Sequence, residues 1–401
     1  MKLRREHLGV MLKALRHAEG WRLRPRVARA LVRSLADFRP VTAGTGTILH
    51  VNGVPVESRA FGRYLGALGR LTRGERVPLV VHVSVTDRCN LRCARCSNRA
   101  MRTVPAPDPE CGRLLALLAG LKAAGAVSIA FTGGEPLLRP DLESLVSACG
   151  PEMASSLFTS GQGLTLARAR ALRAAGLCLA AVSLDDYRAS VHDGLRGEAG
   201  AFRAACEAIG CFLKAGVYTA AQAVAGDNLL AERSRLEEYL RFCASLGVHE
   251  VVLLDPAVMA GRPDAPRSAA DAAYLTELHR RHAADRRLPK VTAAAFLEGG
   301  EAFGCLAGYS FFHVTAAGDL CPCDFVPLSF GKVFEGGLAE ALARAGSAVA
   351  GPCSRCLAVH AAATRRSQAR EPATWEDTRT VLTQFKGGEP AAGMKGIVPK
   401  M

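Results

Sequence analysis

The sequence predicts an α/β fold in which parallel strands alternate with helices. Three observations favour it: strand and helix patterns alternate six times over residues 79–256, Ala and Leu dominate the composition, and aromatic residues make up only 6%. Alternating strands and helices form a parallel sheet through right-handed crossovers. The patterns alone leave an open barrel and a doubly wound sheet as alternatives, and both place chemistry at the carboxyl ends of the strands.

Residues 1–40 form a basic segment before these elements. It carries eleven Lys and Arg against three acidic residues, and so holds +8 of the chain's formal charge of +14. Two sets of apolar residues recur at helical spacing: Leu8, Met11, Leu12 and Leu15, then Val27, Leu31, Leu35 and Phe38. They predict two basic amphipathic helices, which either pack on the protein itself or bind an anionic lipid surface. We expect no nucleic-acid binding, because the aromatic side chains that stack on bases are missing.

A short hairpin and one helix are expected next. Ile48–Val56 carries Asn52-Gly53 at its centre, a pair typical of a two-residue hairpin turn. A helix follows over about Phe61–Leu71, and Pro78 marks the start of the main domain.

The main domain is predicted to contain six strands with helices between them. The expected strands are Leu79–Val85, Val127–Thr132, Ser155–Thr159, Cys178–Leu184, Tyr218–Val224 and Glu250–Leu254. The expected helices are Cys111–Ala124, Asp141–Cys149, Leu164–Ala175, Ala201–Ala215 and Leu229–Leu246, with a further helix near Ala269–Ala284.

Cysteine spacing is the most informative feature of the chain. Cys89, Cys93 and Cys96 follow the first strand as C-x3-C-x2-C, which chance would place on the order of 0.02 times per chain. A cubane [4Fe–4S] cluster needs four ligands, so three thiolates on one loop leave one iron open to a substrate or cofactor. Such metal-type spacings in a large chain favour a reducing cytoplasm over a secreted disulfide framework. No apolar stretch reaches the roughly 18 residues of a membrane span.

A second motif, Phe-Thr-Gly-Gly-Glu-Pro at residues 131–136, follows the second strand. With the cysteine triplet it resembles the radical S-adenosylmethionine (radical SAM) superfamily. Over residues 79–360 this resemblance implies a partial (β/α)6 TIM-like barrel with an N-terminal helical arm and a C-terminal twitch/SPASM-like iron–sulfur domain. It also implies that Cys89, Cys93 and Cys96 hold a [4Fe–4S] cluster that binds S-adenosyl-L-methionine (SAM).

The same resemblance assigns further contacts to SAM. They are Gly133, Gly134, Glu135 and Pro136 for the methionine amino group, Ser160 after the third strand, Ser183 and Asp185 after the fourth, and Arg196 for a carboxylate. Read without the family, Asp185 is a helix N-cap and Arg196 a surface residue. Arg95 stands where the family usually has an aromatic residue near the adenine, and a guanidinium can stack on a purine.

The C-terminal cysteines resemble the ligands of a twitch domain, the shortened form of SPASM. By that match Cys305, Cys323, Cys353 and Cys356 hold a second, auxiliary [4Fe–4S] cluster. Position 362 is Ala where a full SPASM domain continues its cysteines, so one auxiliary cluster is expected. The residues alone also suit a tetrahedral zinc site. Cys321 is a candidate catalytic residue as a hydrogen-atom or proton donor, an alternative ligand to Cys323, or a small buried hydrophobe.

The predicted domains are a basic arm with a hairpin (1–78), the partial barrel (79–256), a helical connector (257–290), the twitch-like domain (291–363) and a polar tail (364–401).

The implied function is reductive cleavage of SAM to a 5′-deoxyadenosyl radical, which takes a hydrogen atom from an unactivated carbon. The substrate is expected to be a small metabolite of natural-product biosynthesis, or a peptide, that is modified oxidatively. A lipid substrate at the membrane surface is the alternative; an iron–sulfur electron carrier or a zinc-stabilised binding protein is a second one. Expected partners are a reductant such as flavodoxin or ferredoxin, the substrate, and an anionic membrane surface.

Overall fold

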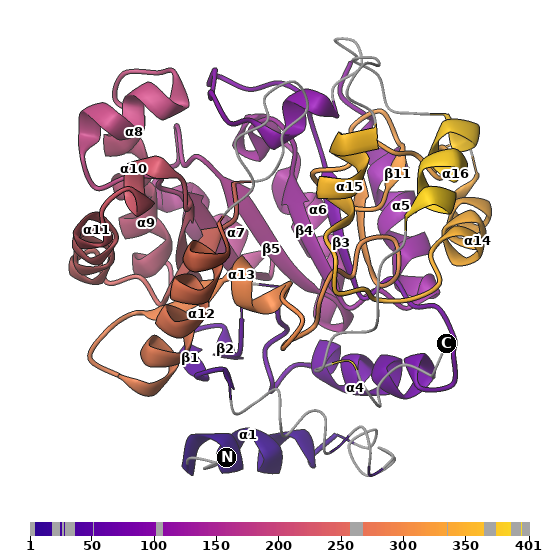
Figure 1. Ribbon diagram of the computed structural model, residues 1–401, viewed down its shortest axis with the longest axis horizontal. Coiled ribbons are helices and arrows are strands. Elements are labelled where there is room, and N and C mark those ends of the chain that lie inside the picture. Colours follow the sequence, from indigo (N-terminus) through magenta and orange to yellow (C-terminus); the bar gives the residue numbers. More distant parts are fainter. Residues whose placement is uncertain are drawn as a thin grey trace.

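A nine-stranded sheet with helices packed against it organises the protein in the computed structural model (Figure 1). The structure describes residues 5–17, 25, 28, 37–50, 52–101, 107–256, 268–334, 336–364, 374–385 and 394. The strand order is β11-β10-β3-β4-β5-β6-β7-β8-β9, and all neighbours are parallel except β10 and β11. The edge strands β9 and β11 do not pair with each other in the described residues, so the sheet forms an open, partial barrel as expected.

The six expected strands form the middle of this sheet, each within one residue of its predicted ends. They are β3 (Val80–Ser84), β4 (Ser128–Thr132), β5 (Ala154–Thr159), β6 (Leu177–Ser183), β7 (Tyr218–Val224) and β8 (Glu250–Leu254). The helices that cross between them or follow them are α5 (Cys111–Ala124), α6 (Leu142–Cys149), α7 (Leu166–Ala174), α8 (Ala189–Arg196), α9 (Ala201–Lys214), α10 (Asp227–Leu230), α11 (Arg233–Ser245) and α12 (Ala269–Ala284). The predicted helix Leu229–Leu246 is wrong in one respect: it is two helices, because Glu232 is extended (φ −134°, ψ 126°) between α10 and α11.

Three further strands extend the sheet beyond the predicted six. Next to β8 lies β9 (Lys290–Ala293), and β10 (Phe311–Val314) pairs in parallel with β3 and carries β11 (Leu320–Cys321). Because β10 joins β3, the cysteine-bearing C-terminal region lies directly beside the strand that precedes the cysteine triplet.

The predicted hairpin at Ile48–Val56 is wrong. The hairpin lies earlier, between β1 (Val41–Ala43) and β2 (Gly46–Ile48), with Gly46 at a left-handed φ of 114°. Asn52-Gly53 still forms a turn, in which the Gly53 N–H donates to the His50 carbonyl. The Ile48 side chain is fully buried among inward-facing residues of the barrel, so β2 closes its lower end (Figure 1). The expected helix follows as α4 (Arg59–Leu71), capped by Ser58.

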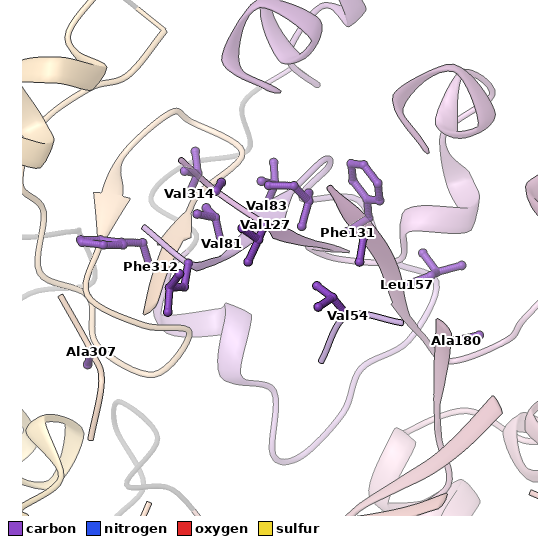
Figure 2. Close-up of a cluster of buried hydrophobic side chains, with 14 of the residues drawn as sticks. Val54, Val81, Val83, Val127, Phe131, Leu157, Ala180, Ala307, Phe312 and Val314 are labelled. Atoms are coloured by element: carbon purple, nitrogen blue, oxygen red, sulfur yellow. The ribbon is translucent and has the colours of Figure 1, made fainter. Parts of the chain in front are cut away.

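The apolar core lies between the sheet and its helices. Figure 2 shows part of it, where Val81 and Val83 from β3 meet Phe312 and Val314 from β10. A smaller core of Leu179, Ala181, Tyr218, Ala220 and Val252 lies inside the barrel. Alternate residues of a strand therefore face the helices and the barrel interior.

Helices also form at both ends of the described chain. At the start lies α1 (Arg5–Ala14), whereas Val27, Leu31 and Leu35 of the second predicted set lie outside the described residues. At the other end are α13 (Ala294–Leu297), α14 (Leu338–Ala348), α15 (Leu357–Thr364) and α16 (Trp375–Gln384). We did not expect α16 in the polar tail; a capping box of Thr374 and Asp377 starts it, and Val381 and Leu382 are buried. Among the described helices, none combines the length and apolar character that a bilayer crossing requires.

Candidate functional site

The cysteine triplet lies on a loop that docks against the end of α8. The Arg92 N–H donates to the Arg196 carbonyl (3.1 Å), and the Ala94 N–H donates to the Leu195 carbonyl (2.9 Å). Gly197 ends α8 at a φ of 67°, and a Cβ there would lie 2.6 Å from the Arg92 carbonyl oxygen. The segment from His192 to the C-cap Gly197 is the last part of α8, and it holds the loop of Cys89, Cys93 and Cys96 in place.

The glycine-rich turn supports the same loop from the other side. The Gly134 N–H donates to the Thr86 carbonyl (2.7 Å), and the Glu135 N–H donates to the Arg88 carbonyl (2.8 Å). A Cβ on Gly133 would lie 2.3 Å from the Thr86 oxygen, and one on Gly134 would lie 2.0 Å from the Arg88 oxygen. Only glycine allows such a close approach, so the turn and the cysteine loop form one unit.

Glu135 holds this unit to the end of β5. Its buried carboxylate accepts four hydrogen bonds, from the N–H of Leu137, the hydroxyl of Thr159, and both the N–H and the hydroxyl of Ser160. Both oxygens are thus occupied by protein donors. The carboxylate positions Ser160 and the η2 turn (Pro136–Leu138), while contacts of Glu135, Pro136 and Ser160 with SAM stay predictions.

Arg196 connects the cysteine loop to the end of β6. Its guanidinium donates to Cys93 Sγ (3.8 Å) and pairs with the Asp185 carboxylate (2.7 Å), so it is not a surface residue. Burial alone lowers the pKa of Arg196, but Asp185 and Cys93 hold it above its ordinary value. Burial raises the pKa of the Cys93 thiol, and Arg196 opposes this rise. Within the described residues, Arg196 Nε is buried with no hydrogen-bond partner, which leaves one donor for an anionic group beside the loop.

Asp185 is held in place by neighbouring elements and is not a helix N-cap, since Arg188 takes that position before α8. The Asp185 N–H donates to His192 Nδ1 (3.0 Å), and its carboxylate accepts from the Val224 N–H (3.1 Å). Ser183, two residues earlier, lies opposite Gln222 in the β6–β7 register. Gln222 Oε1 is buried, has no partner in the part of the chain that the structure describes, and adds an acceptor on the inner face of the barrel.

Asn228 is a residue that the sequence reasoning missed. Its amide donates to the Asp185 carbonyl (2.8 Å) and to Asp186 Oδ2 (3.1 Å), and its oxygen accepts from Arg95 Nη1 (3.2 Å). Arg95 also lies against Gly226, where a Cβ would come within 2.4 Å of its guanidinium. The predicted long helix over this region concealed the short helix α10 that carries Asn228 to the site.

The four C-terminal cysteines come together from three segments. Cys305 and Cys353 exchange backbone hydrogen bonds (2.8 and 3.2 Å). A hydrogen bond with Cys353 raises the pKa of the Cys305 thiol to about 12. Burial raises the pKa of Cys323 well above its ordinary value, and the nearby Cys305 and Cys356 raise it further. A hydrogen bond with Cys305 lowers the pKa of the Cys353 thiol, so these thiols interact directly, and a cationic metal group that binds them as thiolates would complete such a site.

Two further observations concern this region. Cys321 is fully buried and lies opposite His313 in the β10–β11 pair, and burial raises its thiol pKa well above the ordinary value. Within the part of the chain that the structure describes, no three His, Cys, Asp or Glu side chains are arranged to hold a single metal ion. A cubane cluster differs from a single ion in that each thiolate binds its own iron.

Comparisons with known proteins agree with this geometry. Residues 83–255 match the family model of the radical SAM superfamily. The chain is 29% identical over 316 residues to the AdoMet-dependent heme synthase of Oleidesulfovibrio alaskensis, covering 71% of this chain and 80% of that protein. Its fold resembles Streptococcus suis SuiB bound to the precursor peptide SuiA (TM-score 0.57, 17% identity, 70% of this chain and 68% of SuiB). It also resembles anSMEcpe with bound AdoMet (TM-score 0.56, 16% identity, 77% of this chain and 96% of that chain).

Proposed function

The chain belongs to the radical SAM superfamily of enzymes, which use a [4Fe–4S] cluster and SAM, and on this premise we propose that it oxidatively modifies a small metabolite or a peptide. The observation that carries the proposal is the joining of the cysteine loop, the glycine-rich turn and Arg196 into one unit. In this proposal the cluster held by Cys89, Cys93 and Cys96 supplies the electron that cleaves SAM and so provides a 5′-deoxyadenosyl radical for hydrogen-atom abstraction.

The protein's own residues position and enclose the reactants. Arg196 Nε offers its unpaired donor to a carboxylate of SAM, and Asp185 keeps the guanidinium oriented. Ser183 and Gln222 present polar atoms on the inner face of the barrel. Arg95, fixed by Asn228, offers a guanidinium plane to the adenine.

The gathering of Cys305, Cys323, Cys353 and Cys356 supports one auxiliary [4Fe–4S] cluster. Such a cluster suits an oxidative reaction, because it can take the electron of a substrate radical. Similarity to a heme synthase over most of the chain favours a small-molecule substrate, whereas the likeness to SuiB concerns the fold alone. A flavodoxin or ferredoxin supplies the reducing electron in this proposal.

Anaerobic reconstitution tests the proposal. Iron and sulfide are counted, the protein is reduced with dithionite, and 5′-deoxyadenosine is measured after SAM is added. We expect about eight irons, four for each cubane, and formation of 5′-deoxyadenosine. A Cys93→Ala variant is expected to form none; equal formation by variant and wild type would refute the proposal.

The auxiliary cluster has its own test. A Cys323→Ala/Cys356→Ala variant is expected to bind about four irons and still to cleave SAM. If the wild type itself binds about four irons together with one zinc, the C-terminal site is a structural zinc site instead.

A second candidate, reaction with a lipid at a membrane surface, is favoured by one observation. In α1 the residues His7 and Val10 are buried, whereas Leu8 and Leu12 are 55% and 59% exposed, and Leu15 just after the helix is 39% exposed. Of the predicted apolar face, Met11 packs against the core, and the three leucines form an exposed apolar row in a strongly basic segment. Such a row suits the boundary of an anionic bilayer.

Flotation with vesicles of phosphatidylglycerol and phosphatidylcholine tests this candidate. Wild type is expected to float with the vesicles, and Leu8→Glu/Leu12→Glu to stay behind. Leu115→Glu, at a 37% exposed leucine of α5, serves as the control. If wild type and the double variant behave alike, the lipid candidate is excluded.

A further inference from the structure

Two buried histidines and a partly exposed aspartate form a group inside the barrel that none of the proposed cofactor contacts uses. We call His82, Asp324 and His313 the His–Asp–His group. His82 Nδ1 lies 2.6 Å from Asp324 Oδ2, and His313 Nδ1 lies 2.6 Å from Asp324 Oδ1. The two histidines are direct neighbours in the β3–β10 register and are 6% and 2% exposed.

The group faces the barrel interior. Val81 and Val83 of β3 belong to the outer core beneath the helices, as Figure 2 shows. Since successive side chains of a strand point to opposite faces, His82 and Ser84 point inward. Thr86, which receives the glycine-rich turn, lies two residues after Ser84 and three positions before Cys89, and Asp324 directly follows Cys323. Short stretches of chain therefore connect the group to both proposed cluster sites.

The hydrogen bonds to Asp324 determine which nitrogen of each histidine ring carries a proton. A carboxylate only accepts hydrogen bonds, so each Nδ1 carries the proton that it donates to Asp324. Each Nε2 is then left as the outer atom of its ring. In the neutral form of both rings Nε2 is an acceptor: His313 Nε2 lies 3.2 Å from the Ser84 hydroxyl, whereas His82 Nε2 is buried and has no hydrogen-bond partner among the residues that the structure describes.

The His82 ring cannot turn away to find a partner. Phe158 and Phe311 contact it, with ring centroids 5.1 and 4.7 Å away. The carboxylate of Asp324 anchors its other nitrogen. A buried acceptor without a donor costs about 1–3 kcal/mol, so a fixed one on the inner face of a substrate-binding barrel indicates a ligand group.

We propose that His82 Nε2 binds a hydroxyl or N–H group of the substrate and thereby sets which carbon faces the radical. The inference rests on the proposed function, since it concerns the substrate of that same site. Asp324 and His313 are positioning residues, because both Asp324 oxygens are engaged by imidazoles and, within the described part of the chain, His82 is the member of the group with an unpaired atom. The substrate class is thus narrowed to molecules with a hydrogen-bond donor close to the reacting carbon.

The test uses deuterium transfer to 5′-deoxyadenosine in the reconstituted holoenzyme. The probes are benzyl alcohol deuterated at its CH2 group and the equally deuterated benzyl methyl ether, which has the same ring but no donor. In the transfer, the benzylic C–D bond breaks, the deuterium atom joins the 5′ carbon, and the benzylic radical takes one electron from the dithionite in the assay and one proton from water. Wild type is expected to take at least about fivefold more deuterium from the alcohol, the effect of roughly one hydrogen bond.

Three variants test whether His82 causes the preference for the alcohol. In His82→Phe the alcohol and the ether should transfer deuterium equally. His82→Gln, which keeps an acceptor, should restore part of the preference. His249→Phe serves as control, since His249 stacks on Tyr218 at the other end of the sheet. Thermal unfolding of each variant verifies that it folds.

The failure of this inference differs from the failure of the proposed function. An unchanged preference for the alcohol in His82→Phe, or no preference in wild type while 5′-deoxyadenosine forms, would overturn the role of His82. If wild type forms no 5′-deoxyadenosine at all, the proposed function fails and this inference fails with it.

Discussion

Arg196 is the residue on which the proposed cofactor site depends most. One planar group contacts Cys93 and Asp185 and keeps Nε unpaired. Lysine keeps the charge but cannot bond in three directions within one plane. We therefore expect Arg196→Lys to weaken SAM binding about tenfold, measured by equilibrium dialysis with reconstituted protein. Arg203→Lys, at an exposed arginine of α9, is the control and should bind SAM as wild type does; equal binding by all three proteins would contradict the assignment of Arg196.

Glu135 gives a prediction about stability. Its four hydrogen bonds join the glycine-rich turn to β5, and Gln at this position presents an NH2 group to donors that need an acceptor. We expect Glu135→Gln to lower the free energy of unfolding of the apoprotein by about 2–4 kcal/mol, measured by urea denaturation. Glu207→Gln, at an exposed position, should change it little. An unaltered stability would mean that Glu135 serves the ligand rather than the fold.

Residue types could be read from the sequence, but their partners could not. The spacing of Cys89, Cys93 and Cys96 and the Gly-Gly-Glu-Pro motif are local signals, and the structure brings them together as expected. The roles of Asn228 and His82 depend on residues far apart in the chain, such as Arg95 and Asp324. A polar residue within the apolar strand β3 was the available signal for His82.

At the scale of elements, the glycine-rich turn and the cysteine loop act as one unit. A Cβ at Gly134 would lie 2.0 Å from the Arg88 oxygen, so Gly134→Ala must push the two apart. We expect this variant to fold but to lose most of the iron of the first cluster on reconstitution, measured by iron analysis. Gly112→Ala, in α5 with no atom within 4 Å of the added Cβ, should bind iron as wild type does. Full iron content in Gly134→Ala would refute the close fit of turn and loop.

Elements with strong local patterns were predictable and those set by distant pairing were not. The strands β3–β8 have long apolar runs bounded by turn residues, which explains their accurate ends. In contrast, β10 and β11 have four and two residues and exist through pairing with β3 and with each other. The hairpin was misplaced because Asn52-Gly53 is a stronger turn signal than Gly44-Thr45, although burial of Ile48 decides the register.

For the whole molecule, the N-terminal segment is tied to the far edge of the sheet. Phe38 packs edge-on against both His279 of α12 and Phe296 of α13, and Arg39 donates to the carbonyls of Asp285 and Leu288. The His279 ring is buried, stacks on Phe296 at 4.2 Å, and Nε2 contacts the Asp37 carbonyl. This docking therefore requires a neutral histidine.

As the pH is lowered, we therefore expect the free energy of unfolding to fall before the carboxylates of the protein titrate. Burial lowers the pKa of His279 to about 4, and also that of His192 to about 4. Unfolding returns each to about 6.5, so between these values the unfolded state binds more protons and stability falls as the pH falls. By about pH 4 each histidine should cost about 3 kcal/mol, whereas above about pH 6.5 neither should matter. Urea denaturation of the apoprotein across this range measures the slope, and His279→Phe should reduce it by one proton; an identical slope in this variant would show that His279 is not kept neutral by the fold.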